Sequence, residues 1–263
     1  NRANANKLLV RFLLEQCEKT DLRLCDIQAG GLHNAIPREA HATVAVPTAY
    51  AATFVTELEA FVAKVREEFS VTEPDLTAAL EAVDAASTCI CPEQAVRMLK
   101  SLSVVHNGIF AMSQDLEGLV ETSSNLASVR KQGNQVVATT SQRSSVASNL
   151  EYMAAVVRSA FELGGAKCVT NEGYPGWKMN PKSEILKVCV ESYKRLFGKE
   201  PLVRAIHAGL ECGLFSEKYP HLDMVSFGPT LRGVHSPDER LLIPTVQMVW
   251  DHLLDVLKNV PEK

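Results

Sequence analysis

The histidine with the most suggestive surroundings is His235, in the loop Gly228-Pro-Thr-Leu-Arg-Gly-Val-His-Ser-Pro-Asp-Glu239. Glycine, serine and proline fix such a loop and let a ligand approach the backbone closely. Neutral imidazole is a common zinc ligand, and Asp238 or Glu239 can orient the ring from behind. The alternative is a loop histidine that only hydrogen-bonds to the backbone, because a catalytic zinc normally has three protein ligands.

A second group of small and polar residues, Ile206-His-Ala-Gly-Leu-Glu-Cys-Gly213, follows a predicted strand. Gly209 permits close backbone approach, and a helix that begins here offers amide donors to an anion or a carbonyl. Glu211 can receive the free amino group of a small substrate. Equally, the segment can be a tight strand-to-helix turn with Glu211 near the positive end of the helix dipole.

Two further polar residues stand where a peptide can be held. Asn34 lies in the loop Gly30-Gly-Leu-His-Asn-Ala-Ile-Pro-Arg-Glu39 and can hydrogen-bond a peptide carbonyl, although asparagine is also ordinary in turns. Arg143 lies at the end of a predicted strand, and its planar guanidinium suits a bidentate grip on a carboxylate. A solvated surface arginine is the alternative for Arg143.

The remaining reactive residue types form no recognisable motif. The sequence has no Gly-rich phosphate loop, no Gly-x-Ser-x-Gly elbow and no His-Glu-x-x-His helix. Seven scattered cysteines are typical of free thiols in a reducing compartment, and Cys89-Ile-Cys91 lacks a second pair at zinc-finger spacing. The absence of a Cys-x-x-Cys pair argues against a redox protein. Metal-ligand spacing is also missing around His41, His106, His221 and His252, which favours satisfied or surface roles.

Composition narrows the class of protein. The chain has 263 residues, 46% of them hydrophobic, which suffices for two domains. A formal net charge of -4 argues against nucleic acid as a partner, because phosphate binding needs a basic surface. No apolar run approaches the roughly 18 residues of a membrane span. We therefore expect a cytoplasmic protein that binds neither nucleic acid nor membrane.

The start of the chain is unusual. It begins Asn1-Arg-Ala-Asn-Ala-Asn, without an initiator methionine or a signal-peptide pattern, and runs directly into an amphipathic helix. We therefore expect a fragment that lacks an upstream segment.

Apolar periodicity predicts a mixture of helices and strands over the first 172 residues. The expected helices are Ala3–Lys19, Thr48–Phe69, Asp75–Ala86, Pro92–Leu102 and Ser145–Leu163. The expected strands are Leu22–Ala29, Ala40–Val46 and Ala166–Thr170, with three or four more among Val104–Val105, Ile109–Met112, Leu119–Leu126 and Gln135–Thr140. This order, with antiparallel hairpins, predicts an α+β domain of enlarged ferredoxin-like character.

The pattern changes near Gly173 to an alternation of helices with short buried strands, which is typical of a parallel sheet. The expected elements are the helices Ser183–Phe197, Leu210–Phe215 and Thr245–Leu257 and the strands Leu202–His207 and Met224–Phe227. Two short strands cannot make a covered sheet alone, so the rest of the sheet is expected on the upstream segment.

Five segments together resemble one family: Arg2-Ala-Asn-Ala-Asn-Lys-Leu-Leu, Gly30–Ala40, Gly173-Tyr-Pro-Gly-Trp, Ile206-His-Ala-Gly-Leu-Glu-Cys-Gly-Leu-Phe, and Gly228-Pro-Thr followed by His-Ser-Pro-Asp-Glu. They are similar, in the same order, to the Xaa-His dipeptidases, which are cytosolic non-specific dipeptidases of the two-zinc aminopeptidase/carboxypeptidase superfamily. In that family a catalytic domain binds two zinc ions, and an inserted lid domain covers the substrate and pairs in homodimers.

The resemblance implies an α/β and α+β fold, with an enlarged ferredoxin-like lid at 1–172, its first strand missing, and the C-terminal part of the catalytic domain at 173–263. It implies that His235 ligates zinc and that Asn34 and Arg143 contact the carbonyl or carboxylate of a dipeptide. Glu211 and Gly209 lie in the segment that matches the family's substrate-facing loop.

The resemblance also marks what this chain lacks. The family's other metal ligands and the glutamate that acts as general base all precede the chain, so we expect no catalytic base here and no hydrolysis by the chain alone. The alternative function is a non-catalytic dimerisation or binding module derived from the same family.

Overall fold

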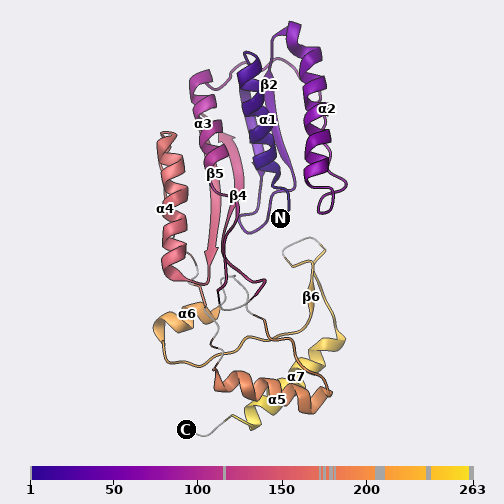
Figure 1. Cartoon of the computed structure of the whole chain (residues 1–263), viewed down its shortest axis with the longest axis vertical. Helices are drawn as coiled ribbons and strands as arrows, with labels where there is room; N and C mark the ends of the chain where they lie inside the picture. Colours follow the sequence, from indigo (N-terminus) through magenta and orange to yellow (C-terminus); the bar gives the residue numbers. More distant parts are fainter. Residues whose placement is uncertain are drawn as a thin grey trace. The chain divides into compact units, whose positions relative to one another are not determined.

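The structure is a computed structural model, and it describes residues 2–114, 117–171, 173, 176–177, 180, 182–204, 211–234 and 238–260. The chain divides into two compact units. Unit 1 comprises Asn1–Met112, Thr122–Gln142 and Ser148–Asn171, and unit 2 comprises Ser113–Glu121, Arg143–Ala147 and Glu172–Lys263. Helices and strands are mixed along the chain, as Figure 1 shows, which confirms the predicted α/β and α+β class.

A five-stranded sheet forms the centre of unit 1. Its order is β2-β1-β4-β3, and β5 also pairs with β4. The strands are β1 (Arg23–Gly30), β2 (Ala40–Ala45), β3 (Gly108–Met112), β4 (Val120–Gln132) and β5 (Gln135–Ser144). β1 runs antiparallel to β2, from Arg23 opposite Ala45 to Ala29 opposite Ala40. It also runs antiparallel to β4, but only at three positions, which end with Gly30 opposite Ser128.

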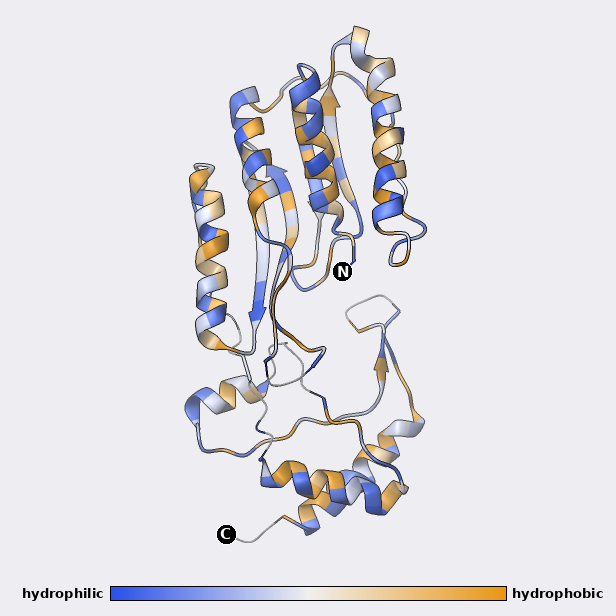
Figure 2. Cartoon of the chain, viewed as in Figure 1, coloured by the Kyte–Doolittle hydropathy of each residue, from blue (hydrophilic) through white to orange (hydrophobic). Residues whose placement is uncertain are grey.

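The helices associated with the sheet are α1 (Ala5–Lys19), α2 (Ala51–Glu68), α3 (Pro92–Val104) and α4 (Ala147–Leu163), with a short 3-10 turn, η1 (Thr48–Tyr50), before α2. α1 and α3 lie side by side (Figure 1). Figure 2 shows that apolar and polar residues share the surface of each helix, as amphipathic packing requires. The predicted apolar stripe of α1 is confirmed, since Phe12 and Leu13 are buried and Phe12 stacks against Phe54 and Phe61 of α2.

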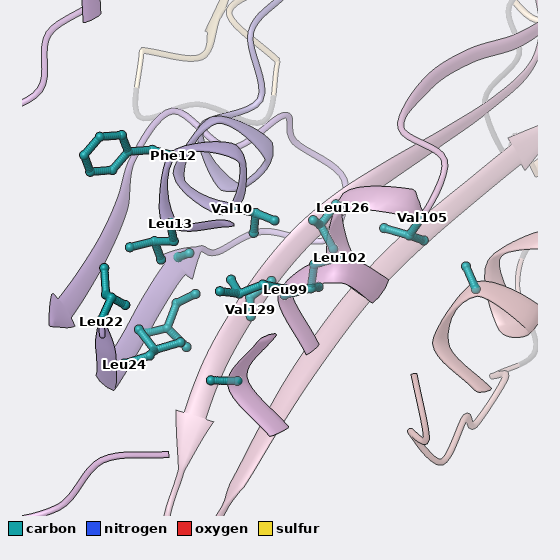
Figure 3. Close-up of a cluster of buried hydrophobic side chains, with 14 of the residues drawn as sticks. Val10, Phe12, Leu13, Leu22, Leu24, Leu99, Leu102, Val105, Leu126 and Val129 are labelled. Carbon is teal, nitrogen blue, oxygen red and sulfur yellow. The ribbon is translucent and has the colours of Figure 1, made fainter. Parts of the chain in front are cut away.

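The core of unit 1 brings α1, α3, β1 and β4 together (Figure 3). Its members include Val10, Leu13, Leu22, Leu24, Leu99, Leu102, Val105, Leu126 and Val129, all less than a tenth exposed. Burial of a large aliphatic side chain stabilises the fold by about 1.5–3 kcal/mol. This core fixes β1, which leads into the loop of Asn34, and β4, which forms hydrogen bonds with that loop.

Lys7 links α1 to the C-terminus of α3. Its ammonium donates to the carbonyls of Leu102 at 2.8 Å, Ser103 at 2.7 Å and Val105 at 2.9 Å. These carbonyls lie at the end of a helix, where backbone acceptors lack partners and a cation is favoured by the helix dipole. Burial lowers the pKa of Lys7 to about 8, so the ammonium keeps its three N–H donors at pH 7.

The substitution Lys7→Met is therefore expected to lower the free energy of unfolding of the 263-residue chain by about 1–3 kcal/mol, because three carbonyls lose their donor. Urea titration followed by circular dichroism measures this loss. The control is Lys64→Met on the exposed side of α2, which is expected to change the unfolding free energy by less than about 0.5 kcal/mol. Equal effects of the two substitutions would contradict a specific role for Lys7.

The predicted helix Asp75–Ala86 is wrong, because residues 76–86 have no regular secondary structure. Leu80 and Val83 are 48% and 65% exposed, so this segment buries no continuous apolar stripe against the core. A helix this short is marginal in water without such packing, whatever its intrinsic propensity. Of the three or four strands expected between residues 103 and 143, β3, β4 and β5 are present, whereas Val104–Val105 is not a strand because α3 continues through Val104.

Three predicted strands are absent from the described parts of 166–170, 202–204 and 224–227, which carry no ladder. Val169 and Leu202 are 88% and 82% exposed. A strand exists only where a neighbour pairs its backbone groups, and these segments have no such neighbour within the described residues. Residues 205–207 of the second predicted strand lie outside the described residues.

Unit 2 is organised around two packed helices, α5 (Glu184–Phe197) and α7 (Pro244–Lys258), with the short helix α6 (Glu211–Lys218). Ser183 caps α5 by accepting the backbone N–H of Leu186, and Gly198 ends it in the left-handed conformation at φ 62°. His252 of α7 is buried and contacts the carbonyl of Cys189 at 2.9 Å. This confirms the satisfied role predicted for His252. None of the helices in the described ranges has the length and apolarity needed to cross a membrane.

All seven cysteines are free. Cys25 and Cys189 are buried, whereas Cys89 and Cys91 are exposed. Ile90, between them, packs partly against the core, and its backbone N–H donates to the carbonyl of Leu24 at 2.8 Å. Burial, followed by a hydrogen bond with Cys89, raises the pKa of the Cys25 thiol to about 11. Cys25 is therefore a poor nucleophile at neutral pH.

Candidate functional site

Two of the predicted site residues, His235 and Gly209, lie outside the described residues. The described residues on either side of His235 form a small antiparallel ladder, β6 (Leu231–Arg232) with β7 (Arg240–Leu241). Leu242 donates to the carbonyl of Thr230 at 2.9 Å, and Thr230 donates to the side chain of Thr245 at 3.0 Å. The described residues on either side of His235 are therefore held together near the start of α7. The sequence did not predict this ladder.

No group of three His, Cys, Asp or Glu side chains gathers to hold a metal within the part of the chain that the structure describes. A catalytic zinc normally has three protein ligands, so these described residues do not by themselves provide a complete zinc site. Any metal held by His235 needs ligands from elsewhere in the protein.

Arg143 is the second-last residue of β5, in agreement with its predicted place at a strand end. Its side chain is half-buried, and it makes no ion pair or hydrogen bond with any described residue. A guanidinium in this state keeps its five donors for an external acceptor. This availability suits the bidentate grip on a carboxylate, because a carboxylate accepts two parallel N–H bonds.

The backbone beside Arg143 is tightly packed in unit 2. A Cβ placed on Gly176 would lie 2.2 Å from the carbonyl oxygen of Ser144 and 3.0 Å from the Cα of Ser145. Only glycine allows the backbone at position 176 to approach the end of β5 so closely. The hydroxyl of Ser144 accepts the N–H of Val146 at 3.0 Å, where β5 gives way to α4. Arg143 therefore projects from a constrained corner of the backbone.

Asn34 lies in a turn between β1 and β2 and is half-buried. Backbone bonds close this loop from Gly30 to Glu39 at 3.0 Å, from Gly31 to Ala127 at 3.2 Å and from Ala35 to Leu32 at 3.3 Å. The side chain of Asn34 forms no hydrogen bond with a described residue, so its amide remains available to a carbonyl.

Glu211 is the first residue of α6 and is exposed. An acidic residue in the first turn of a helix complements the dipole, which satisfies the structural alternative considered for it. Glu211 has no hydrogen bond or ion pair to a described residue, so a role toward an amino group remains a prediction. Asn34 belongs to unit 1, whereas Arg143 and Glu211 belong to unit 2. Within unit 2, no contact between described side chains joins Arg143 to Glu211.

Unit 2 also contains an apolar cavity of about 340 Å³, lined by α5, residues 201–204, residues 224–227, Trp177 and His252. None of the predicted site residues that the structure describes (Asn34, Arg143 and Glu211) lines it. The cavity coincides with two segments that were predicted as sheet strands, and apolar side chains such as Leu202 and Phe227 are exposed there.

Comparison with known proteins finds similarity to peptidases in both sequence and fold. A family model described as the peptidase dimerisation domain matches residues 1–73. The chain is 39% identical over 260 residues to the cytosol non-specific dipeptidase of Escherichia coli (strain K12), covering 99% of this chain and 54% of the relative.

The fold is similar to the crystal structure of aminoacylhistidine dipeptidase from Vibrio alginolyticus, with a TM-score of 0.86 and 38% identity. This match covers 100% of the chain and 54% of the solved structure, so the chain spans about half the length of the relatives that it matches. In sequence and in fold, the chain is therefore similar to about half of a cytosol non-specific dipeptidase and of an aminoacylhistidine dipeptidase.

Proposed function

We propose that the complete protein is a metal-dependent dipeptidase that hydrolyses aminoacyl-histidine and related dipeptides, and that this chain supplies its dimerisation part and much of its substrate-binding surface. The single observation that carries the proposal is the similarity along nearly the whole chain to a cytosol non-specific dipeptidase. The fold match to an aminoacylhistidine dipeptidase supports the histidine-containing substrate class.

The roles of the side chains follow from their chemistry. Arg143 holds the substrate carboxylate with two parallel N–H bonds, which is supported by its lack of any partner among the described residues. Asn34 donates its amide N–H to the carbonyl of the dipeptide. Glu211 accepts the free amino group, and Gly209 lets the substrate approach the backbone closely. The chain itself contributes no general base, which we assign to a glutamate of the complete protein.

His235 is proposed as one metal ligand, with zinc as the metal and two ions in the complete protein. When bound, such ions polarise the scissile carbonyl and lower the pKa of a coordinated water. The hairpin base formed by β6 and β7 supports this role, because it fixes both ends of the loop that carries the imidazole. The incomplete set of ligands among the described residues is consistent with further ligands outside the chain.

The domain arrangement that we propose assigns residues 1–172 to a lid and dimerisation domain and 173–263 to the C-terminal part of the catalytic domain. The match of residues 1–73 to a peptidase dimerisation domain supports pairing of two copies through the first of these. It also favours the second candidate function, a non-catalytic dimerisation module. We place the complete protein in the cytoplasm as a homodimer that binds neither nucleic acid nor membrane.

The two candidate functions predict different results for the chain and the complete protein. Both are expected to sediment as dimers if the first 172 residues pair. Only the complete protein is expected to bind about two equivalents of zinc and to hydrolyse dipeptides. Metal analysis and histidine release, measured side by side, test this. A complete protein that dimerises but neither retains zinc nor cleaves dipeptides would favour the non-catalytic module.

A further inference from the structure

A cluster of asparagine side chains joins α1, β4 and the loop of Asn34 in unit 1. Asn4, 4% exposed, caps α1 by accepting the N–H of Lys7 at 3.2 Å. Its amide nitrogen lies 2.9 Å from the side-chain oxygen of Asn107, 3.1 Å from that of Asn125 and 3.1 Å from the carbonyl of Leu126. A single side chain therefore bridges the start of a helix, a turn and a strand.

The side-chain amides of this cluster make hydrogen bonds to β4 where β1 no longer pairs with it. Ladder pairing between β1 and β4 ends at Gly30 opposite Ser128, so Leu126 of β4 has no β1 residue beside it. Its N–H donates instead to the side-chain oxygen of Asn107 at 2.9 Å, and its carbonyl accepts from Asn6 at 3.0 Å as well as from Asn4. Buried backbone groups require such partners, so the cluster stabilises β4 beyond the point where its pairing with β1 ends.

The cluster continues into the loop of Asn34. The amide of Asn125 donates to the carbonyl of Ala35 at 2.7 Å, next in sequence to Asn34. The other end of the loop leaves the sheet at Gly30, whose φ of 70° favours glycine and where a Cβ would lie 2.0 Å from the carbonyl of Ala127. The loop is thus held at Gly30 by the backbone and at Ala35 by a side chain that itself accepts from Asn4.

We propose that Asn125 is a positioning residue for dipeptide binding. Through its hydrogen bond to the carbonyl of Ala35, it holds Asn34 in a fixed position relative to the end of β1. This inference rests on the proposed function, in which Asn34 binds the substrate. Asn125 itself does not contact the substrate. A loop fixed in advance loses less conformational entropy when the dipeptide binds, so the contribution of Asn125 falls on binding rather than on the chemical step.

The variant Asn125→Asp tests the side-chain N–H of Asn125, which it removes. It keeps the size of the side chain and an oxygen that can accept from Asn4, but it places an acceptor opposite the carbonyl of Ala35. In the complete protein it is expected to raise KM for an aminoacyl-histidine dipeptide about five- to tenfold, the worth of one hydrogen bond, with kcat within about twofold of the wild type. Asn125→Ala is expected to do the same.

The matched control is Tyr50→Phe. It removes one side-chain hydrogen bond, from the hydroxyl of Tyr50 to Gln16 of α1 at 3.2 Å, away from the loop of Asn34. It is expected to lower stability by a similar amount without changing KM. Hydrogen exchange provides a readout that does not depend on activity, since amides of residues 31–39 are expected to exchange faster in both Asn125 variants and at the wild-type rate in Tyr50→Phe.

Wild-type exchange of residues 31–39 in Asn125→Asp would overturn the proposal, and so would a wild-type KM in an active enzyme. If the complete wild-type protein shows no hydrolysis, the proposed function has failed. The exchange rates then still decide whether Asn125 holds the loop.

Discussion

Replacing His235 by alanine in the complete protein is expected to remove bound zinc and hydrolytic activity together. Loss of a residue that merely orients a metal ligand typically costs about 10–100-fold in affinity or activity, so loss of the ligand itself is expected to cost at least about 100-fold in kcat/KM. Zinc per subunit, measured on the dialysed protein, is expected to fall by about one equivalent from the two that we propose.

The control for this substitution is His221→Ala, which changes an exposed histidine of the same unit. It is expected to leave zinc content and turnover unchanged. Added zinc offers a second check, because a weakened site refills at high metal concentration and part of the activity of His235→Ala is then expected to return. Wild-type zinc content and turnover in His235→Ala would show that the imidazole is not a ligand.

Replacing Arg143 by alanine is expected to raise KM for a dipeptide by about 30-fold or more. Truncation of one partner of a buried charge pair costs about 2–5 kcal/mol, and the half-buried position of Arg143 points to the lower part of that range. At about 1.4 kcal/mol for each factor of ten, 2 kcal/mol corresponds to roughly 30-fold. Arg143→Lys keeps the charge but loses the planar fork, so an intermediate KM is expected.

A change in the substrate identifies the partner of Arg143. A dipeptide whose C-terminal carboxylate is amidated has lost the group that the guanidinium binds, so the wild type and Arg143→Ala are expected to share a similar, high KM for it. Arg97→Ala, an exposed arginine on α3, serves as the control and is expected to match the wild type with both substrates. An unchanged ratio between the two substrates in Arg143→Ala would rule out carboxylate recognition by this residue.

The elements that the sequence predicted correctly carry their own local signals. The stripe that includes Phe12 and Leu13 buries one face of α1, and Pro92 begins α3 as its missing N–H allows. β1 was predicted within one residue at each end, from alternation bounded by Gly30. The place of Arg143 at a strand end was predicted for the same reason, because the apolar alternation of β5 stops just before it.

The failures share one physical cause, which is that pairing and packing partners are not local. Residues 202–204 and 224–227 have the composition of buried strands, but no described strand pairs with them. The segment 75–86 has helix-forming residues, yet Leu80 and Val83 remain 48% and 65% exposed. The β6–β7 ladder is two residues long on each side, too short for a periodic signal.

The asparagine cluster was missed for a related reason. Asn4 and Asn6 were visible in the sequence, but their partners Asn107 and Asn125 lie more than 100 residues away from Asn4. The sequence signal for this cluster is an asparagine at a position where an apolar side chain is expected. Asparagine is unfavourable inside an apolar helix face or a buried strand unless its amide is hydrogen-bonded. Asn6, inside the first turn of α1, is such a residue and implies a buried acceptor nearby, whereas Asn4 is also explained by its place as the helix cap.

The most direct test of the account is the release of free histidine when the complete protein, loaded with zinc, is incubated with L-alanyl-L-histidine. Equimolar alanine and histidine are expected to appear, and removal of zinc by a chelator is expected to stop the reaction reversibly. An intact dipeptide after prolonged incubation with a folded, zinc-loaded protein would contradict the proposal that this chain is part of a dipeptidase.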